Sequence, residues 1–324
     1  MTHFSDILAN QHQIQNRIRY SKDFLAKTRK QFASLPGGRN ADVCVFAAGS
    51  LGRFETGRIS DLDLFILADG KNSPSGKKLS KLQEIELFAD LIKLNEQLKL
   101  PPFSGDGRYL KVHELEDLIN ATGDSRDDSE NLFTTRLLLL LESQALSNDA
   151  LYDKALNEVL DNYFRDGKGR KDFQPLFLLN DILRYWRTLC LNYERDRGLA
   201  KPWWKRNLNL KFSRKLTVFS TALAIISRRV TTTAEFIAIA KMVPLERLSV
   251  ALDAIDDQSL VSQYAKILDD YESFLAAKSY ADLEDKDEEI LNGFKEKAER
   301  FGNFMYSALH SNKLDPALVK YLAI

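Results

Sequence analysis

The chain has 324 residues, 44% of them hydrophobic, and its 46 lysines and arginines are balanced by 46 aspartates and glutamates. This length is typical of about two domains, and the hydrophobic content excludes a disordered chain. The net charge of zero excludes a polycation that coats nucleic acid along its whole length. No apolar run is long enough to span a membrane, and the only cysteines, Cys44 and Cys190, lie in apolar runs. We therefore predict a cytoplasmic protein without a membrane segment.

The first part of the chain alternates between helical and strand-like patterns. Apolar residues at helical spacing precede the chain-breaking sequence Pro36-Gly37-Gly38, and short apolar runs rich in β-branched residues follow it. In order, the patterns predict one or two helices within residues 1–35, buried strands at 43–50 and 62–67 separated by a turn or short helix, a helix at 79–98 and a third strand at 108–112.

After about residue 113 the strand patterns end, and a succession of helices is expected. Thr233 is predicted as an N-cap and Pro244 as the first residue of a helix. The expected helices span residues 114–121, 130–147, 149–164, 175–196, 211–228, 233–242, 244–256, 259–277 and 286–309. We therefore predict an α+β protein, in which a small α/β core with a mixed sheet (residues 1–122) precedes an all-helical domain (residues 123–324).

Two carboxylates stand at the start of the second predicted strand. Asp61 and Asp63 are two residues apart, so in a strand their side chains point to the same face. Neighbouring anions repel each other, and no basic residue accompanies them on that strand face. A divalent cation between them removes the repulsion, and ligands that are all oxygen suit Mg²⁺ or Mn²⁺. The pair therefore predicts a metal site.

A second polar pattern follows the first predicted strand. Gly49 allows backbone N–H groups to approach a phosphate closely, and the hydroxyl of Ser50 adds a donor. Arg53 adds a positive charge, which Glu55 can orient. A phosphate-binding turn opposite a metal-binding pair of carboxylates is what nucleotidyl transfer requires, with one metal ion on the triphosphate and another that activates the acceptor hydroxyl.

The segments GSLGRFE (49–55) and SDLDLFIL (60–67) together resemble the signature of the DNA polymerase β-type nucleotidyltransferase superfamily. The resemblance is closest to the branch of the PII-protein uridylyltransferases, and the leucine-rich segment 136–142 is similar in style to a helix of that branch. It implies transfer of a nucleoside monophosphate from an NTP to an acceptor hydroxyl, on a protein side chain, an RNA end or a nucleotide, with release of pyrophosphate. It also implies that the glycine and serine of the first segment bind the triphosphate, and that the two aspartates of the second bind the metal ions.

The chain departs from that family at several points. Phe54 follows the motif arginine where the uridylyltransferases usually have a glycine, and no His-Asp hydrolase signature occurs, so the reverse reaction is not expected. The superfamily usually has a third acidic residue on a later strand. Asp106 is our candidate for this catalytic and metal-binding carboxylate, with Glu114 and Glu116 as weaker rivals. The other interpretation of Asp106 is a simple Asp-Gly turn.

A basic segment within the helical part is the remaining candidate for nucleotide binding. Residues 180–215 contain ten lysines and arginines against three acids, interleaved with tyrosine and tryptophan. A helix start is expected near Ser213, where flanking cations would favour an anion. The residues predicted to wall the nucleotide pocket are Arg184, Lys211, Ser213, Arg214 and Lys215. The alternative is a solvated surface with local ion pairs such as Asp181–Arg184.

Two other classes of function compete with an active transferase. One is a catalytically silent nucleotidyltransferase-fold module that acts in regulation or interaction, and the other is a nucleic-acid-binding protein that uses the basic segment alone. The presence of both Asp61 and Asp63 argues against the first. Net neutrality and the lack of a second basic region argue against the other.

Overall fold

The computed structural model describes residues 3–70, 72–103, 107, 110–167, 170, 172–195, 203–278 and 288–322. Its contacts divide the chain into two compact units. The sheet unit comprises Asn16–Asn162, and the helical unit comprises Met1–Gln15 together with Tyr163–Ile324. The mixed α+β architecture is thus confirmed, whereas the expected boundary after residue 122 lies inside the sheet unit. Within the described residues, every helix is too short or too polar to cross a membrane.

A four-stranded mixed sheet, in the order β3-β2-β1-β4, is the centre of the sheet unit. Strand β1 (Val43–Ala47) pairs antiparallel with β2 (Leu64–Ala68), and β2 pairs parallel with β3 (Val112–Glu114). The two-residue strand β4 (Gln144–Ala145) pairs antiparallel with the end of β1. The first two expected strands are confirmed, although β1 ends three residues early and β2 begins two residues later and ends one residue later than expected. The prediction of one helix over 130–147 is wrong, because the helix ends before β4.

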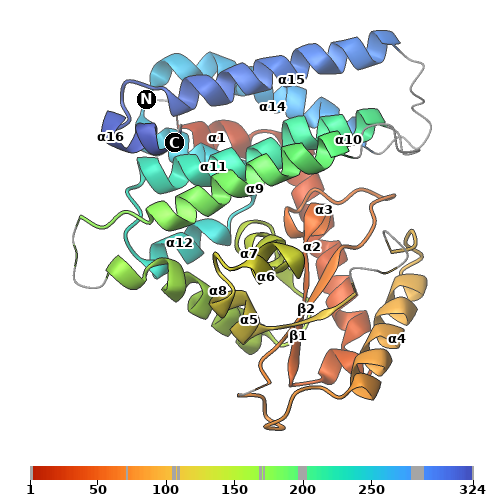
Figure 1. Ribbon diagram of the computed structural model, residues 1–324. Coiled ribbons are helices and arrows are strands. Elements are labelled where there is room, and N and C mark those ends of the chain that lie inside the picture. The colour runs from red at the N-terminus through yellow and green to blue at the C-terminus, as the bar shows by residue number, and fades with distance from the viewer. Residues whose placement is uncertain are drawn as a thin grey trace. The chain divides into compact units, whose positions relative to one another are not determined.

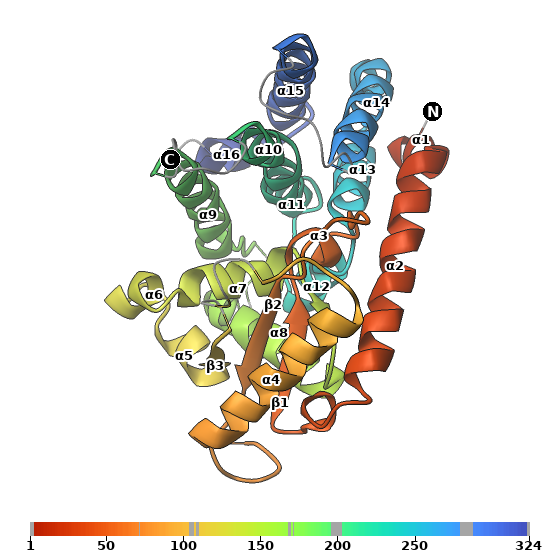
Figure 2. The same ribbon diagram turned by 90° about the vertical axis from the view of Figure 1, so that its right-hand side faces the viewer.

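Helices enclose this sheet, so that all five residues of β1 are buried. The views in Figures 1 and 2 place α4 and α8 on opposite faces of the sheet. Helix α4 begins with a capping box, in which Ser80 and Gln83 bond each other's backbone N–H groups. The helices of the sheet unit are α2 (His12–Phe32), which starts in the helical unit, α3 (Gly49–Gly52), α4 (Lys81–Gln97), α5 (Leu115–Asn120), α6 (Ser125–Ser129), α7 (Leu132–Leu141) and α8 (Asp149–Tyr163).

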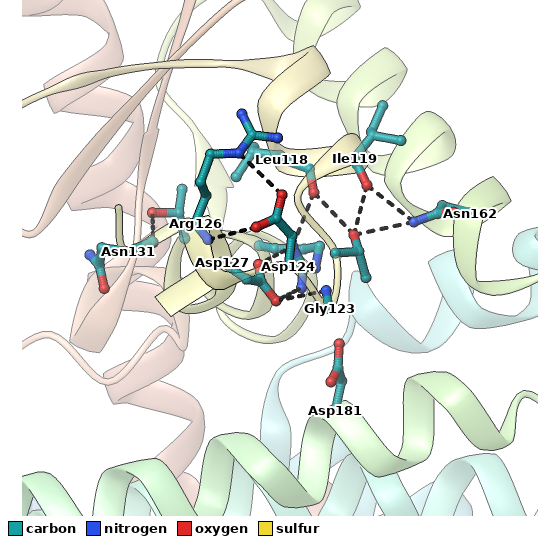
Figure 3. Close-up of polar contacts among 12 residues, drawn as sticks. Leu118, Ile119, Gly123, Asp124, Arg126, Asp127, Asn131, Asn162 and Asp181 are labelled. Atoms are coloured by element: carbon teal, nitrogen blue, oxygen red, sulfur yellow. Dashed lines mark hydrogen bonds and ion pairs between the residues drawn. The ribbon is translucent and has the colours of Figure 1, made fainter. Parts of the chain in front are cut away.

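A buried ion pair joins three of these helices. Arg136 of α7 donates to both carboxylate oxygens of Asp127 of α6 at 2.9 Å, and both side chains are fully buried. The same guanidinium donates to the carbonyl oxygen of Leu118 in α5 at 3.0 Å. Asp127 also accepts from the backbone N–H of Gly123, in the turn between α5 and α6 (Figure 3). The pair therefore fixes the short helices α5 and α6 against α7.

The helical unit is organised around α11, in which nearly every side chain between Leu216 and Ile226 is buried. Thr232 caps α12, one residue before the predicted Thr233, whereas Pro244 opens α13 as predicted. The helices of this unit are α1 (Phe4–Ala9), α9 (Leu176–Arg195), α10 (Trp203–Asn209), α11 (Lys215–Ser227), α12 (Thr233–Ala240), α13 (Pro244–Ile255), α14 (Val261–Ala277), α15 (Glu288–Leu309) and α16 (Pro316–Val319).

Two polar contacts hold elements of this unit together. Asp253 of α13 accepts from the backbone N–H groups of Phe4 and Ser5, which caps the start of α1. Arg247, which is 2% exposed, donates to two carbonyl oxygens at the end of α12 and to the hydroxyl of Thr221 in α11. Both contacts satisfy helix ends that have no partner within their own helix.

We expect Asp127→Asn to destabilise the protein by about 3–5 kcal/mol, because it leaves the buried guanidinium of Arg136 without its counter-charge. Urea unfolding followed by circular dichroism measures the loss. Asp124→Asn is the matched control, since Asp124 is exposed and caps α6, a position that asparagine fills equally well. Equal unfolding midpoints for the two variants would contradict this role of the ion pair.

The buried imidazole of His113 predicts a loss of stability in mild acid. Its side chain is 4% exposed, its Nδ1 has no partner, and burial lowers its pKa from 6.5 to about 4. The folded state therefore binds fewer protons than the unfolded state between these values. The contribution, roughly 3 kcal/mol, is fully present above about pH 6.5 and is lost as the pH falls towards 4. Urea unfolding at a series of pH values should show this slope in the wild type and a smaller one in His113→Gln.

Candidate functional site

The order of strand, turn and strand predicted for the motif is present at one end of the sheet. Gly49 begins the short helix α3 directly after β1, and the backbone N–H of Ala48 donates to the carbonyl oxygen of Asp63 at 2.9 Å. Both aspartates precede β2, which starts one residue later than Asp63. Asp61 is exposed, Leu62 is buried, and Asp63 is half-buried. The alternation expected of a strand thus extends ahead of the paired residues.

Gly49 and Asp63 bring the two halves of the motif into contact. Gly49 has a φ of +63°, in the left-handed region that favours glycine. A Cβ atom at this position would lie 2.2 Å from Oδ2 of Asp63. The glycine is therefore required twice, by its backbone conformation and by the carboxylate that lies against it. This close approach places the turn of Gly49 and Ser50 beside one of the two predicted metal ligands.

The guanidinium of Arg53 holds this turn from inside the protein. Its Nε lies 3.0 Å from Glu55 and its Nη1 lies 2.5 Å from Glu142, and all three side chains are at most 6% exposed. A Cβ atom on Gly52 would lie 1.9 Å from the carbonyl oxygen of Glu142, so the backbones also meet here. Arg53 is thus a buried member of an ion-pair network, which corrects its prediction as a ligand of nucleotide phosphate. Glu55 orients it, as expected.

Sequence reasoning did not assign a role to Glu142. It follows the last residue of α7 and lies 89 positions after Arg53. The only signal in the sequence was that charged residues bracket the leucine run, with Arg136 at one end and Glu142 at the other. Each bracketing charge proves to form a buried ion pair, Arg136 with Asp127 and Glu142 with Arg53.

Phe54, which follows Arg53 in the motif, has a left-handed backbone conformation. Its φ is +55°, which a bulky residue rarely adopts, and its side chain is 8% exposed. The ammonium of Lys22, on α2, lies 5.5 Å from the centre of its ring. Phe54 therefore has a backbone conformation that glycine would adopt without strain, with an aromatic side chain packed at this position.

The basic segment of the helical unit differs from its prediction. Residues Leu210–Arg214 form a π-helical turn between α10 and α11, and the residues at both its ends have right-handed helical backbone angles. No helix starts at Lys211, so the predicted helix-start anion site is wrong. Ser213 is fully buried, and its hydroxyl accepts from Tyr271 at 3.4 Å. Lys215 is half-buried, and burial lowers its pKa, with a further contribution from the charge of Lys211.

Arg184 lies on α9, where its guanidinium forms an ion pair with the carboxylate of Asp181. The two side chains are 3.7 Å apart, and Asp181, 6% exposed, also accepts from the hydroxyl of Tyr163 at 2.6 Å. The alternative of a local ion pair therefore describes this part of the helix. Arg184, Lys211, Arg214 and Lys215 all belong to the helical unit, and their contribution to nucleotide binding stays a prediction.

The structure describes two of the three candidates for the third carboxylate. Asp106 lies outside the described residues. Glu114 accepts from the backbone N–H of Gly70 at 3.1 Å, and Glu116 lies in the first turn of α5. Among the described residues, no group of three or more histidine, cysteine, aspartate or glutamate side chains is arranged to hold a metal ion.

Asp61 and Asp63 nevertheless fit a magnesium ion by their donor chemistry. Mg²⁺ is usually held by one or two carboxylates and completed by water and substrate phosphates. The half-buried carboxylate of Asp63 lies against the glycine whose Cβ would displace it, so it has a defined position at the edge of the turn. Two oxygen ligands at the mouth of a glycine turn suit a metal ion that is bound together with a phosphate.

We expect Gly49→Ala to destabilise the protein more than Gly76→Ala. Both glycines have left-handed angles, which cost alanine about 1–2 kcal/mol, but nothing lies within 4 Å of a Cβ on Gly76. The difference between the two therefore measures the clash with Asp63. In the double variant Gly49→Ala/Asp63→Ala, the additional loss of stability that distinguishes Gly49→Ala from Gly76→Ala should disappear. Urea unfolding tests this, and equal losses for both single variants would contradict the contact.

Comparison with models of protein families, with curated proteins and with solved structures found no match to this chain. The resemblance of its motif to the nucleotidyltransferase superfamily therefore stays a prediction. What the chain can do chemically follows from the residues that the fold brings to one end of the sheet: Gly49, Ser50, Asp61 and Asp63, with Arg53 and Glu142 behind them.

Proposed function

We propose that this protein is a Mg²⁺-dependent nucleotidyltransferase. It would transfer a nucleoside monophosphate from an NTP to an acceptor hydroxyl and release pyrophosphate. The observation that supports this most directly is the contact between Gly49 and Asp63, because it sets a glycine turn of the phosphate-binding kind against a carboxylate of the metal-binding kind. Gly49 and Asp63, which are 14 residues apart in sequence, each contribute one half of such a site.

The residues of the turn have distinct tasks in this proposal. The first backbone N–H groups of a helical turn have no acceptor within it, so those near Gly49 and Ser50 can donate to the triphosphate. The hydroxyl of Ser50 adds another donor. Arg53 acts as a positioning residue, because its ion pair with Glu142 fixes the end of the same turn. A turn held this way keeps its N–H groups aimed at one place.

The carboxylates of Asp61 and Asp63 would hold the metal ion. When bound, Mg²⁺ neutralises charge on the phosphates and lowers the pKa of the attacking hydroxyl. The aspartates contribute by fixing the position of that charge at the edge of the turn, where the α-phosphate would lie. Asp106 is the proposed acceptor of the proton from the hydroxyl. The acceptor molecule is a protein side chain, an RNA end or another nucleotide.

We expect Asp61→Asn and Asp63→Asn each to lower the transfer rate by roughly 100-fold or more, as loss of a group that stabilises transition-state charge does. The assay incubates the protein with each of the four labelled NTPs and Mg²⁺. Cell-lysate protein, total RNA or free nucleotides serve in turn as acceptor. Pyrophosphate release and the labelled product are measured together, and the product identifies the acceptor class.

Asp23→Asn is the matched control, because Asp23 is an exposed aspartate on α2 and lies outside the motif. It should retain wild-type turnover. Electron paramagnetic resonance of Mn²⁺ bound together with nucleotide distinguishes the two ways in which the proposal can fail. Metal and nucleotide binding without transfer to any acceptor would indicate a catalytically silent module. A protein that transfers nucleotide equally well without either aspartate would show that the metal site lies elsewhere.

A further inference from the structure

Helix α4 has apolar residues on two faces, and only one of them is covered. The inner face, with Leu87, Leu91 and Leu94, is buried in the sheet unit. On the outer face Leu82 is 72% exposed and Ile85 52% exposed, and Ile92 completes the row at 47%. Leu82 has the most exposed of the large hydrophobic side chains in the described part of the chain. We call Leu82, Ile85, Ala89 and Ile92 the outer stripe.

The spacing of the outer stripe is that of a helix-pairing seam. Its members are separated by three, four and three residues, the pattern of alternating a and d positions in a coiled coil. A surface helix that packs only on its own domain needs a single apolar stripe. A second stripe exposed to solvent is typical of a surface that binds a partner. In Figure 2, α4 lies on the outside of the sheet unit, in front of the strands.

The outer stripe ends at a hollow. A pocket of about 330 Å³ is lined by Ile92 itself and by apolar side chains beyond the end of α4, including Leu100, Phe103 and Leu110. The carboxylate-bearing residue Glu96, one helical turn after Ile92, also lines it. One end of the stripe therefore has a protruding side chain, Leu82, and the other end has a recess next to an acidic residue.

We propose that α4 pairs antiparallel with α4 of a second copy of this chain, with each Leu82 seated in the recess beside Ile92 of the other copy. Leu82 and Ile92 are ten residues apart, about 15 Å along the helix. A two-fold axis midway between these two residues places the Leu82 end of each copy against the recess beside Ile92 of the other copy. Such self-complementarity is what an interface between identical subunits requires.

The pairing also matches the remaining residues of the helix. Ile85 faces Ala89 of the second copy, so a large side chain meets a small one, as knobs-into-holes packing needs. Lys81, next to Leu82, comes close to Glu96 of the second copy, which gives opposite charges at each end. A parallel arrangement would instead set Leu82 against Leu82 and leave the recess unfilled. The antiparallel second copy is therefore the occupant that fits.

Sedimentation analysis of the full chain tests the proposal. The wild type should be a dimer, and Leu82→Glu/Ile85→Glu should raise its dissociation constant by about 100-fold or more, because it places two charges per copy within the apolar seam. Leu191→Glu is the matched control, since Leu191 of α9 is 70% exposed but lies outside the stripe. It should leave the dimer intact. Circular dichroism should show unchanged helix content in all variants.

Disulfide trapping tests the orientation. In a Cys190→Ser background, Leu82→Cys/Ile92→Cys should give a covalent dimer on mild oxidation, and neither single variant should. The two positions cannot bridge within one chain, because about 15 Å exceeds the reach of a disulfide. Cys44 does not interfere, since it is fully buried and burial raises the pKa of its thiol to about 12.

Three results would overturn the proposal. The first is a wild-type chain that stays monomeric at the highest soluble concentration. If Leu82→Glu also lowers the melting temperature of that monomer, another part of the same chain covers the stripe. The second is a dimer that survives Leu82→Glu/Ile85→Glu. The third is efficient cross-linking of Leu82→Cys alone, which would show parallel pairing.

Discussion

The buried guanidinium of Arg53 is the point on which the site depends. A charge removed from water is strongly unfavourable unless it is paired, and here Glu55 and Glu142 surround it. Glu55 comes from the motif itself, whereas Glu142 comes from the end of α7. The packing of α7 therefore supplies one of the two carboxylates that pair with the arginine of the motif turn. A local signature of a few residues is in this way made dependent on a distant part of the chain.

That dependence explains the architecture around β1. The chain leaves α7 at Glu142, and within two residues it pairs with the end of β1 as β4. The contact between Gly52 and the carbonyl oxygen of Glu142 leaves no room for a side chain at that point. Backbone pairing, close packing and the ion pair thus act on one short stretch. Together they hold the turn of Gly49 at the edge of the sheet, against Asp63.

Local patterns in the sequence were sufficient for β1, β2 and most helices, because periodicity and turn residues report directly on burial. They also placed Gly49, Ser50, Asp61 and Asp63 together, since the spacing of the motif is itself local. They failed where the outcome depends on distant partners. The two-residue β4 has no periodicity, and the interior position of Arg53 follows from Glu142, which is 89 residues away. Ser213 was expected near a helix start, whereas it lies in a π-helical turn between two helices. The spacing of apolar residues does not reveal such a turn.

The π-helical turn at Leu210–Arg214 has a consequence for how this chain can change in length. A turn of this kind accommodates one residue more than an α-helical turn, so it rotates the faces of the helix that follows by about 100°. Phe212 and Ser213, adjacent in sequence, are both fully buried here. Within α11, an insertion or deletion would turn a buried face outwards. At the π turn the helix already contains such an irregularity, so within the continuous run of α10 and α11 this segment can gain or lose a residue at a lower structural cost than α11 can.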